Sequence, residues 1–414
     1  MSTEPSAVVI PLPRPVNWRR NLAALWLAEV TAIFGFSFAY PFLPLFLHRD
    51  LGIRNGPELA FWTGVAASAT GFSLAVASPI WGVLADRYGR KPMLVRAMIG
   101  GGLSVGLVGL VRTAQQLTAL RVVQGATSGT VAAATALVAA ETPLAEMGWS
   151  LGILSSAIAL GSAIGPAAGG VAANLVGLRA TFIGGGILLL LAAIPVILVV
   201  RESAARVPRR SAPRPLHVLR AAGPGTVEAL GVLIVAQVFL QTSYAATQQM
   251  VVLRLLQFDP GAASTVTGIA FAAGGIATAV AGVTYARLLR VTGYRLLTVT
   301  AATLMAAATV AAAAAPSLVL VVAALVVASL LFGALIPAFS AMIGLQTPGS
   351  AQATVFGVSS SATALGFGIG PLTGGIIASR AGVATALLTS AAVAFIMAVL
   401  VAVAAREPQI PAER

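Results

Sequence analysis

The sequence predicts an all-α membrane protein with twelve transmembrane helices in two pseudo-symmetric six-helix bundles. One supporting observation is composition: the 414 residues are 58% hydrophobic and 9% charged, with a mean hydropathy of +0.94. No soluble domain buries so much apolar surface with so few charges. The other is a repeat, because the pattern G-x-x-x-G-P-x-x-G-G occurs at 161–170 and again 205 residues later, at 366–375. A motif duplicated at this distance indicates two similar halves.

The individual spans follow from the length that a bilayer requires, about 20 mostly apolar residues per helix. We expect them near 20–47, 59–85, 92–112, 116–140, 149–173, 178–200, 226–252, 262–288, 295–314, 316–342, 351–378 and 382–405. The longest polar interruption is rich in arginine and proline and is interpreted as a basic linker. The predicted organisation is a tail (1–19), an N-terminal bundle (20–200), the linker (201–225), a C-terminal bundle (226–405) and a second tail (406–414).

The distribution of Lys and Arg predicts the orientation in the membrane. Most of them fall in the tails, the linker and the loops after the second and eighth spans. The opposite side carries Arg49, Arg54, Arg112, Arg179, Arg254 and Arg380. Because cytoplasmic loops carry an excess of positive charge, we expect a multi-pass protein of the cell inner membrane with both termini and the linker in the cytoplasm.

Several function classes are excluded by residues that the chain lacks. Cys is absent and the two His, His48 and His217, are far apart, so thiolate chemistry and a clustered metal site are not expected. The single Lys, Lys91, is followed by Pro92, so no phosphate-binding P-loop can form. The net charge of +13 is spread over loops between apolar spans, which argues against a nucleic-acid partner. We expect no enzyme activity and no cofactor.

The loop after the second span contains a charged motif, G-V-L-A-D-R-Y-G-R-K at 82–91, and a second copy from Gly282 has Ala286 in place of its Asp. A carboxylate among guanidinium groups can form bidentate pairs. We expect these residues to form a cytoplasmic latch between the halves when the substrate site faces outward. The alternative is that the charges only set topology. The predicted latch residues are Gly82, Asp86, Arg87, Gly89, Arg90 and Lys91, with Glu141 as a further partner.

These motifs resemble those of a known family. The 82–91 segment resembles the loop signature of the major facilitator superfamily, and Arg121-x-x-Gln124-Gly125 resembles its second motif. The 161–170 segment is similar to the motif of the drug:proton antiporters in that superfamily. The resemblance covers the whole chain and implies a bacterial-type exporter of drugs or other small molecules with twelve helices.

The repeated glycine motif predicts close helix contacts, because small residues let membrane helices approach backbone to backbone. We interpret it as a tight seam between the two halves, with ordinary packing as the alternative. The seam residues would be Gly161, Gly165, Pro166, Gly169 and Gly170 in the first half and Gly366, Gly370, Pro371, Gly374 and Gly375 in the second.

Two ionisable residues fall deep inside predicted spans, Glu29 and Arg121. Such residues are costly in a bilayer and usually functional, so both are candidates for proton coupling. Two stripes at helical spacing are candidate walls of a substrate cavity, although the glutamines could instead join helices to one another. The stripes consist of Ile33, Phe36 and Tyr40 in the first span and Gln237, Gln241, Tyr244 and Gln248 in the seventh.

Together these features favour a proton-driven antiporter, expected to be monomeric, that exports lipophilic small molecules, cations among them, by alternating access. Its partners would be the substrate, protons and the lipid bilayer. A carrier of a defined metabolite, such as a sugar or an amino-acid derivative, is the first alternative, and a non-transporting receptor or scaffold is the second.

Overall fold

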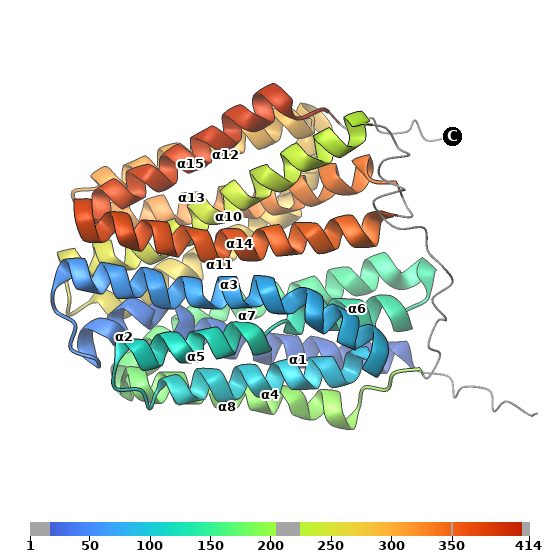
Figure 1. Cartoon of the computed structure of the whole chain (residues 1–414), viewed down its shortest axis with the longest axis horizontal. Helices are drawn as coiled ribbons and strands as arrows, with labels where there is room; N and C mark the ends of the chain where they lie inside the picture. The colour runs from blue at the N-terminus through green and yellow to red at the C-terminus, as the bar shows by residue number, and fades with distance from the viewer. Residues whose placement is uncertain (1–16, 204–223, 349–350, 408–414) are drawn as a thin grey trace, which may run out of the picture.

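The fold was analysed in a computed structural model that describes residues 17–203, 224–348 and 351–407. Within these ranges twelve helices are long and apolar enough to cross a membrane, which confirms the predicted fold class. Figure 1 shows the N-terminal helices, blue to green, as one bundle beside the bundle of C-terminal helices, yellow to red. Most of the predicted tails and most of the predicted linker lie outside the described residues.

Six spans form the N-terminal bundle. Their helices are α1 (Trp18–Ala39) continued by η1 (Tyr40–Phe42) and α2 (Leu43–Arg49), α3 (Gly56–Tyr88), α4 (Arg90–Val108), α5 (Ala114–Thr127) with α6 (Thr130–Glu141), α7 (Met147–Leu175) and α8 (Gly177–Leu198); the short η2 (Leu144–Glu146) precedes α7. Two of the spans are therefore interrupted. The first contains a 3₁₀ turn with Pro41 inside it, and Pro44 opens α2. The fourth, predicted as one helix over 116–140, is broken at Ser128–Gly129.

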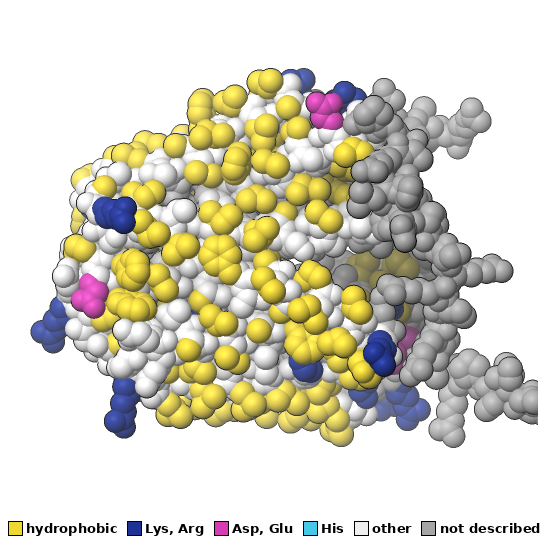
Figure 2. Space-filling model, in the orientation of Figure 1, with side chains coloured by type: hydrophobic (Ala, Val, Ile, Leu, Met, Phe, Trp, Pro, Cys, Tyr) yellow, Lys and Arg dark blue, Asp and Glu magenta, His cyan; other side chains and the backbone are white. Residues whose placement is uncertain are grey.

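The C-terminal bundle consists of uninterrupted spans. They are α10 (Pro224–Phe258), α11 (Ala263–Thr292), α12 (Tyr294–Ala314), α13 (Leu318–Gln346), α14 (Gln352–Ala381) and α15 (Val383–Ala404). We call the end of the molecule where α8 finishes and α10 begins the linker end, and the end that carries α2 the opposite end. In Figure 2 the visible side chains are mostly apolar along the middle of the molecule, and Lys and Arg lie near the two ends, as a bilayer requires.

The hydrophobic core shows how the two bundles meet. One cluster of buried residues at the opposite end draws on both halves, including Phe46 and Leu47 from the first and Val251 and Leu255 from the second. Towards the linker end the core divides into separate clusters that each lie within one half. Figure 2 shows a hollow between the halves at the linker end. The protein is therefore closed at the opposite end and open at the linker end.

Candidate functional site

The charged motif at the linker end is held by an acidic residue that follows the sixth span. Gly89 has φ +101°, a conformation that favours glycine, and it separates α3 from α4. The Glu202 carboxylate accepts hydrogen bonds from the backbone N–H groups of Arg90 (2.8 Å) and Lys91 (3.0 Å). In return, the Lys91 ammonium donates to the Ile197 and Val200 carbonyls at the end of α8. Each helix end thereby satisfies backbone groups that have no intrahelical partner.

The same exchange recurs in the second half. Glu407 accepts from the N–H groups of Tyr294 (2.6 Å) and Arg295 (2.8 Å), and the Arg295 guanidinium donates to the Ala402 carbonyl at the end of α15. Glu202 and Glu407 are 205 residues apart, the offset of the glycine motif. Sequence reasoning missed both residues, although the repeated dipeptide Arg-Glu after the sixth and twelfth spans is a signal that could have found them.

The predicted latch residues that the structure describes bind within their own half. The Arg90 guanidinium donates to the Ala136 carbonyl, and Arg87 lies over the Tyr88 ring. Glu141 accepts from the N–H and hydroxyl of Ser203. The Asp86 side chain lies outside the described residues, and Gly82 has open space where a Cβ would lie. Since the halves are apart at this end, a latch that forms only in the other conformation stays a prediction.

The glycine stripe does not form the expected seam between the halves. A Cβ added at Gly161, Gly165 or Gly169 of α7 would meet α1 of the same half. In α14 the equivalent residues Gly366, Gly370 and Gly374 meet α10, again within one half. The interpretation as a seam is therefore wrong for these residues. Helical spacing places the glycines on one face, but it does not say which neighbour that face meets.

The halves do meet at the last glycine of each motif. A Cβ on Gly170 would lie 3.1 Å from the Gly268 Cα of α11, and one on Gly375 would lie 2.7 Å from the Gly64 Cα of α3. Both contacts sit beside the motif proline, because a Cβ on Gly64 would lie 2.5 Å from the Pro371 carbonyl oxygen. The equivalent distance from Gly268 to the Pro166 carbonyl oxygen is 2.9 Å. Close backbone contact thus joins the halves at two pseudo-symmetric points.

Glu29 is sealed inside the N-terminal bundle. Its side chain is 0% exposed, and neither carboxyl oxygen has a hydrogen-bond partner among the described residues. The side chain of Thr130, the first residue of α6, lies close enough to interact with the carboxyl. The carboxyl therefore faces the break in the fourth span.

The break itself is built from specific contacts. Gly129 has φ +116°, and the α5 end leaves carbonyls without helical partners. Two of them are bound by side chains, Ala126 by the Trp81 indole (2.6 Å) and Thr127 by the Arg96 guanidinium (2.9 Å). Arg96 also stacks on Trp81, with 3.7 Å from its guanidinium carbon to the ring centroid. A cation is thus already fixed at the α5 end, while the α6 start, the positive end of a helix dipole, lies beside Glu29.

Arg121 does not join Glu29. Its Nε donates to the Ala66 carbonyl (3.2 Å) and its Nη1 to the Gln124 amide oxygen (2.6 Å), and its guanidinium lies 5.2 Å from the Tyr40 ring centroid. Tyr40, at the start of η1, lies eleven positions after Glu29 in the first span, which corresponds to about 16 Å of helix. The structure therefore does not bring the two predicted proton-coupling residues together.

The predicted cavity walls are partly formed. Six of their residues are half-buried, a level of exposure that suits the wall of an open space: Ile33, Phe36, Tyr40, Gln237, Gln241 and Gln248. Gln237 accepts a hydrogen bond from Ser359 of α14 (2.6 Å). Tyr244 differs from the expectation, because it is buried, stacks on Phe332 with ring centroids 3.7 Å apart, and donates to Ser329.

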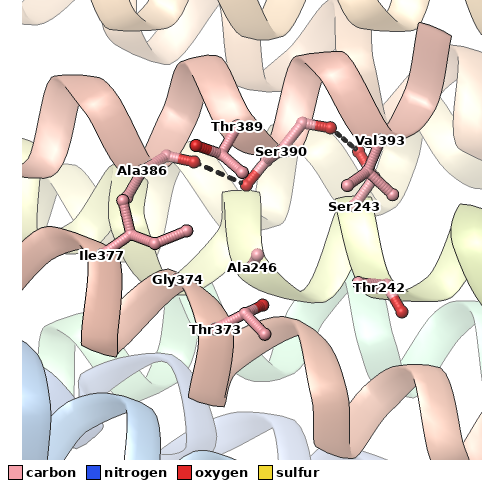
Figure 3. A pocket seen from close by; sticks show the side chains of 10 residues that line it. All are labelled: Thr242, Ser243, Ala246, Thr373, Gly374, Ile377, Ala386, Thr389, Ser390 and Val393. Atoms are coloured by element: carbon pink, nitrogen blue, oxygen red, sulfur yellow. Dashed lines mark hydrogen bonds between the residues drawn. The ribbon is translucent and has the colours of Figure 1, made fainter. Parts of the chain in front are cut away.

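A small pocket within the C-terminal half has a different character. It lies among α10, α14 and α15 and is too small for a drug-sized molecule. Figure 3 shows that its two serine hydroxyls are already engaged: Ser243 donates to the Ser390 carbonyl and Ser390 to the Ala386 carbonyl. We therefore place the candidate substrate site between the halves rather than here.

The model of the Major Facilitator Superfamily matches residues 25–247 and 233–414, which together cover nearly the whole chain. The chain belongs to the major facilitator superfamily. Among similar proteins of this superfamily is Multidrug resistance protein MdtG of Escherichia coli (strain K12 / DH10B), 30% identical over 93% of this chain and 94% of the relative. MdtG of Proteus mirabilis (strain HI4320) is 42% identical, but over 41% of this chain and 42% of the relative.

Solved structures share the superfamily fold. A bacterial homolog of the human lysosomal transporter Spinster, in an inward-facing and occupied conformation, has a TM-score of 0.76 at 16% identity, covering 94% of this chain and 98% of its own. The nucleoside transporter NupG has a TM-score of 0.78 at 13% identity, covering 92% and 98%. The human organic anion transporter MFSD10 has a TM-score of 0.67 at 19% identity, covering 93% and 99%. The protein is thus a multi-pass membrane transporter of the superfamily, and small molecules are its substrates.

Proposed function

We propose that this transporter is a proton-coupled antiporter that exports lipophilic small molecules. The names of the MdtG relatives support drug export as the role. The aromatic and amide side chains along the predicted walls suit lipophilic substrates with few polar groups. A shape that is closed at one end and open at the other suits alternating access.

Glu29 is the observation that carries the proton-coupling part of the proposal. A carboxyl that is buried without a partner is costly unless it has a use, and in a membrane span that use is typically proton or ion transfer. Glu29 holds a proton while it is sealed and releases it when helix movement admits water. The α6 start beside it favours the carboxylate once the proton has left.

The direction of transport rests on the resemblance to multidrug resistance proteins, and the orientation of the chain indicates which side the open end faces. Arg87, Arg90 and Lys91 gather at the linker end. Under the positive-inside rule this end is cytoplasmic, so the structure is open to the cytoplasm. Substrate enters from that side, and protons move inward down their gradient.

The experiment is efflux of a lipophilic dye from cells that express the chain, with and without a protonophore. Efflux that the protonophore abolishes is the expected result. The proposal fails if efflux continues unchanged with the protonophore, because another energy source then drives it. No efflux of any lipophilic dye would instead favour the metabolite carrier.

The residue test is Glu29→Gln in inverted membrane vesicles. This variant keeps the size of the side chain but cannot release a proton, so drug-dependent proton movement should be lost. The control is Glu58→Gln, at an exposed position near the start of α3. Full proton-coupled transport by Glu29→Gln would remove Glu29 from the mechanism.

A further inference from the structure

Arg121 is a second buried charged group, and the proposed proton pathway does not use it. It is 3% exposed, and while Nε and Nη1 are held by Ala66 and Gln124, its Nη2 has no hydrogen-bond partner in the part of the chain that the structure describes. No carboxylate lies within ion-pair distance of it among the described residues. A buried cation without a counter-charge is costly, so its retention calls for an explanation.

Two further polar groups at this place are also unsatisfied. The Tyr40 hydroxyl is buried and makes no hydrogen bond of normal geometry with the described residues. The Gln249 amide of α10 is 0% exposed and lies close enough to that hydroxyl to interact with it, but no hydrogen bond of normal geometry joins its oxygen or nitrogen to a described residue. Tyr40 and Arg121 come from the N-terminal half and Gln249 from the C-terminal half, so the cluster spans the two halves.

The chemistry of the cluster favours an anionic oxygen as its ligand. Arg121 Nη2, the Gln249 amide nitrogen and the Tyr40 hydroxyl are three donors, and one of them belongs to a permanently charged group. Charge-assisted hydrogen bonds from a guanidinium are the strongest that a carboxylate accepts in proteins. A lipophilic cation would place a second positive charge beside Arg121.

The surroundings of the cluster suit an apolar body attached to such a group. The Tyr40 ring contacts both Phe36 of α1 and Phe367 of α14, with centroid distances of 5.7 Å to each. Phe36, Tyr40 and Phe367 are half-buried rather than sealed. Aromatic side chains of this kind bind flat apolar molecules by stacking.

We infer that Arg121, Tyr40 and Gln249 form a subsite for an anionic oxygen, and that the substrates include lipophilic carboxylates. This inference rests on the proposed function, since it names the class of molecule that the exporter takes. It differs from the expectation of cationic substrates attracted by Glu29, because the charged group at the contact between the halves is the cation of Arg121, whereas Glu29 lies within the N-terminal bundle.

The position of the subsite also gives it a role in the transport cycle. It lies where the halves meet, and the Tyr40–Phe367 contact joins the two bundles. When the halves part at the opposite end, Gln249 and Phe367 move away from Arg121 and Tyr40. The bound group then loses part of its donor set and meets water, which favours release on that side.

The test compares three pyrene probes with the same ring and linker: pyrenebutanoate, its methyl ester, and a pyrenebutyl-trimethylammonium cation. Binding to the purified full chain is measured by fluorescence without a proton gradient. We expect the wild type to bind the carboxylate roughly tenfold more tightly than the ester, as one charge-assisted hydrogen bond provides. In Arg121→Gln this preference should disappear.

Matched variants separate loss of the subsite from a general loss of positive charge. Arg254→Gln removes the same charge from a half-buried arginine at the opposite end, where Arg254 donates to the Ala315 carbonyl, and it should retain the preference. Gln249→Leu should weaken carboxylate binding even if Arg121→Gln fails to fold. Equal binding of all three probes by the wild type, tightest binding of the cation, or an unchanged preference in Arg121→Gln and Gln249→Leu would each overturn the subsite. Dye efflux that depends on the proton gradient would leave the proposed function standing in that case.

Discussion

At the scale of single residues, the two acids that follow the sixth and twelfth spans show how charge organises the linker end. Glu202 and Glu407 each accept two backbone N–H groups at the start of a helix. Such acceptors satisfy groups that the helix cannot, and they complement the helix dipole. The charges of this end therefore stabilise each half before any contact between the halves is considered.

Replacing either acid by alanine should destabilise its own half. We expect Glu202→Ala and Glu407→Ala each to cost about 1 kcal/mol, as the loss of a helix cap does. The measurement is the thermal unfolding of purified protein. Glu228→Ala is the control, because Glu228 is exposed at the same end; an equal loss in this variant would show that general surface charge, and not capping, is responsible.

At the scale of helices, the break in the fourth span is the feature that distinguishes the surroundings of Glu29. The α5 end is closed by Trp81 and Arg96, and the α6 start faces the carboxyl. A discontinuous helix offers such unpaired ends inside the bilayer, and ion sites in transporters are built on them.

The break can be tested by comparing two glycines with positive φ, Gly129 (φ +116°) and Gly177 (φ +84°). A Cβ would have open space at both. Alanine should therefore cost a similar amount of backbone strain at each position, about 1–3 kcal/mol. Proton coupling, measured as drug-dependent proton movement in vesicles, should fall in Gly129→Ala but not in Gly177→Ala. Equal coupling in the two variants would show that the geometry of the break is irrelevant to Glu29.

The paired glycines between the halves give a second prediction at this scale. Gly64→Ala and Gly268→Ala should push neighbouring helices apart at the closed end and slow efflux, because the added Cβ meets backbone. Gly231→Ala is the control, since nothing lies within 4 Å of its Cβ position. Efflux at the wild-type rate in the first two variants would mean that this contact is not needed.

At the scale of the whole molecule, the shared core at the opposite end and the separate cores at the linker end define one state of a two-state device. Side-chain contacts reinforce the closed end, where Asn174 of α7 donates to Thr265 of α11 and accepts from Ser264. Transport requires these contacts to break when the linker end closes.

Cross-linking between introduced cysteines tests that requirement without reaction at native thiols, because the chain has no Cys. In a variant with Asn174→Cys and Thr265→Cys, a short thiol-specific cross-linker should lock the closed end and abolish efflux, and a cleavable linker should restore it after reduction. In the wild type, the Asn174 Nδ2 and Thr265 Oγ1 atoms at these positions are 2.7 Å apart. Each single Cys variant serves as a control, and unimpaired efflux by the cross-linked protein would contradict alternation at this end.

Much of the architecture could be predicted from the sequence. Twelve spans and two halves follow from hydropathy and from the motif repeated at a distance of 205 residues, since the bilayer sets the length and composition of each span. The loop motif was recognisable because its residues are contiguous in the sequence. The partners of those residues were not predicted: Glu141 meets Ser203, and the acid that holds the loop, Glu202, lies more than a hundred residues away.

The sequence by itself therefore determined the fold class, the family and the places where ionisable and small residues enter the membrane. Only the tertiary structure decided what those residues touch. It turned the glycine stripes towards α1 and α10 of their own halves, sealed Glu29 behind a broken helix, and left Arg121 without a counter-charge between the halves. The physical reason is that helical periodicity assigns residues to a face, whereas the neighbour of that face depends on how all twelve helices pack together.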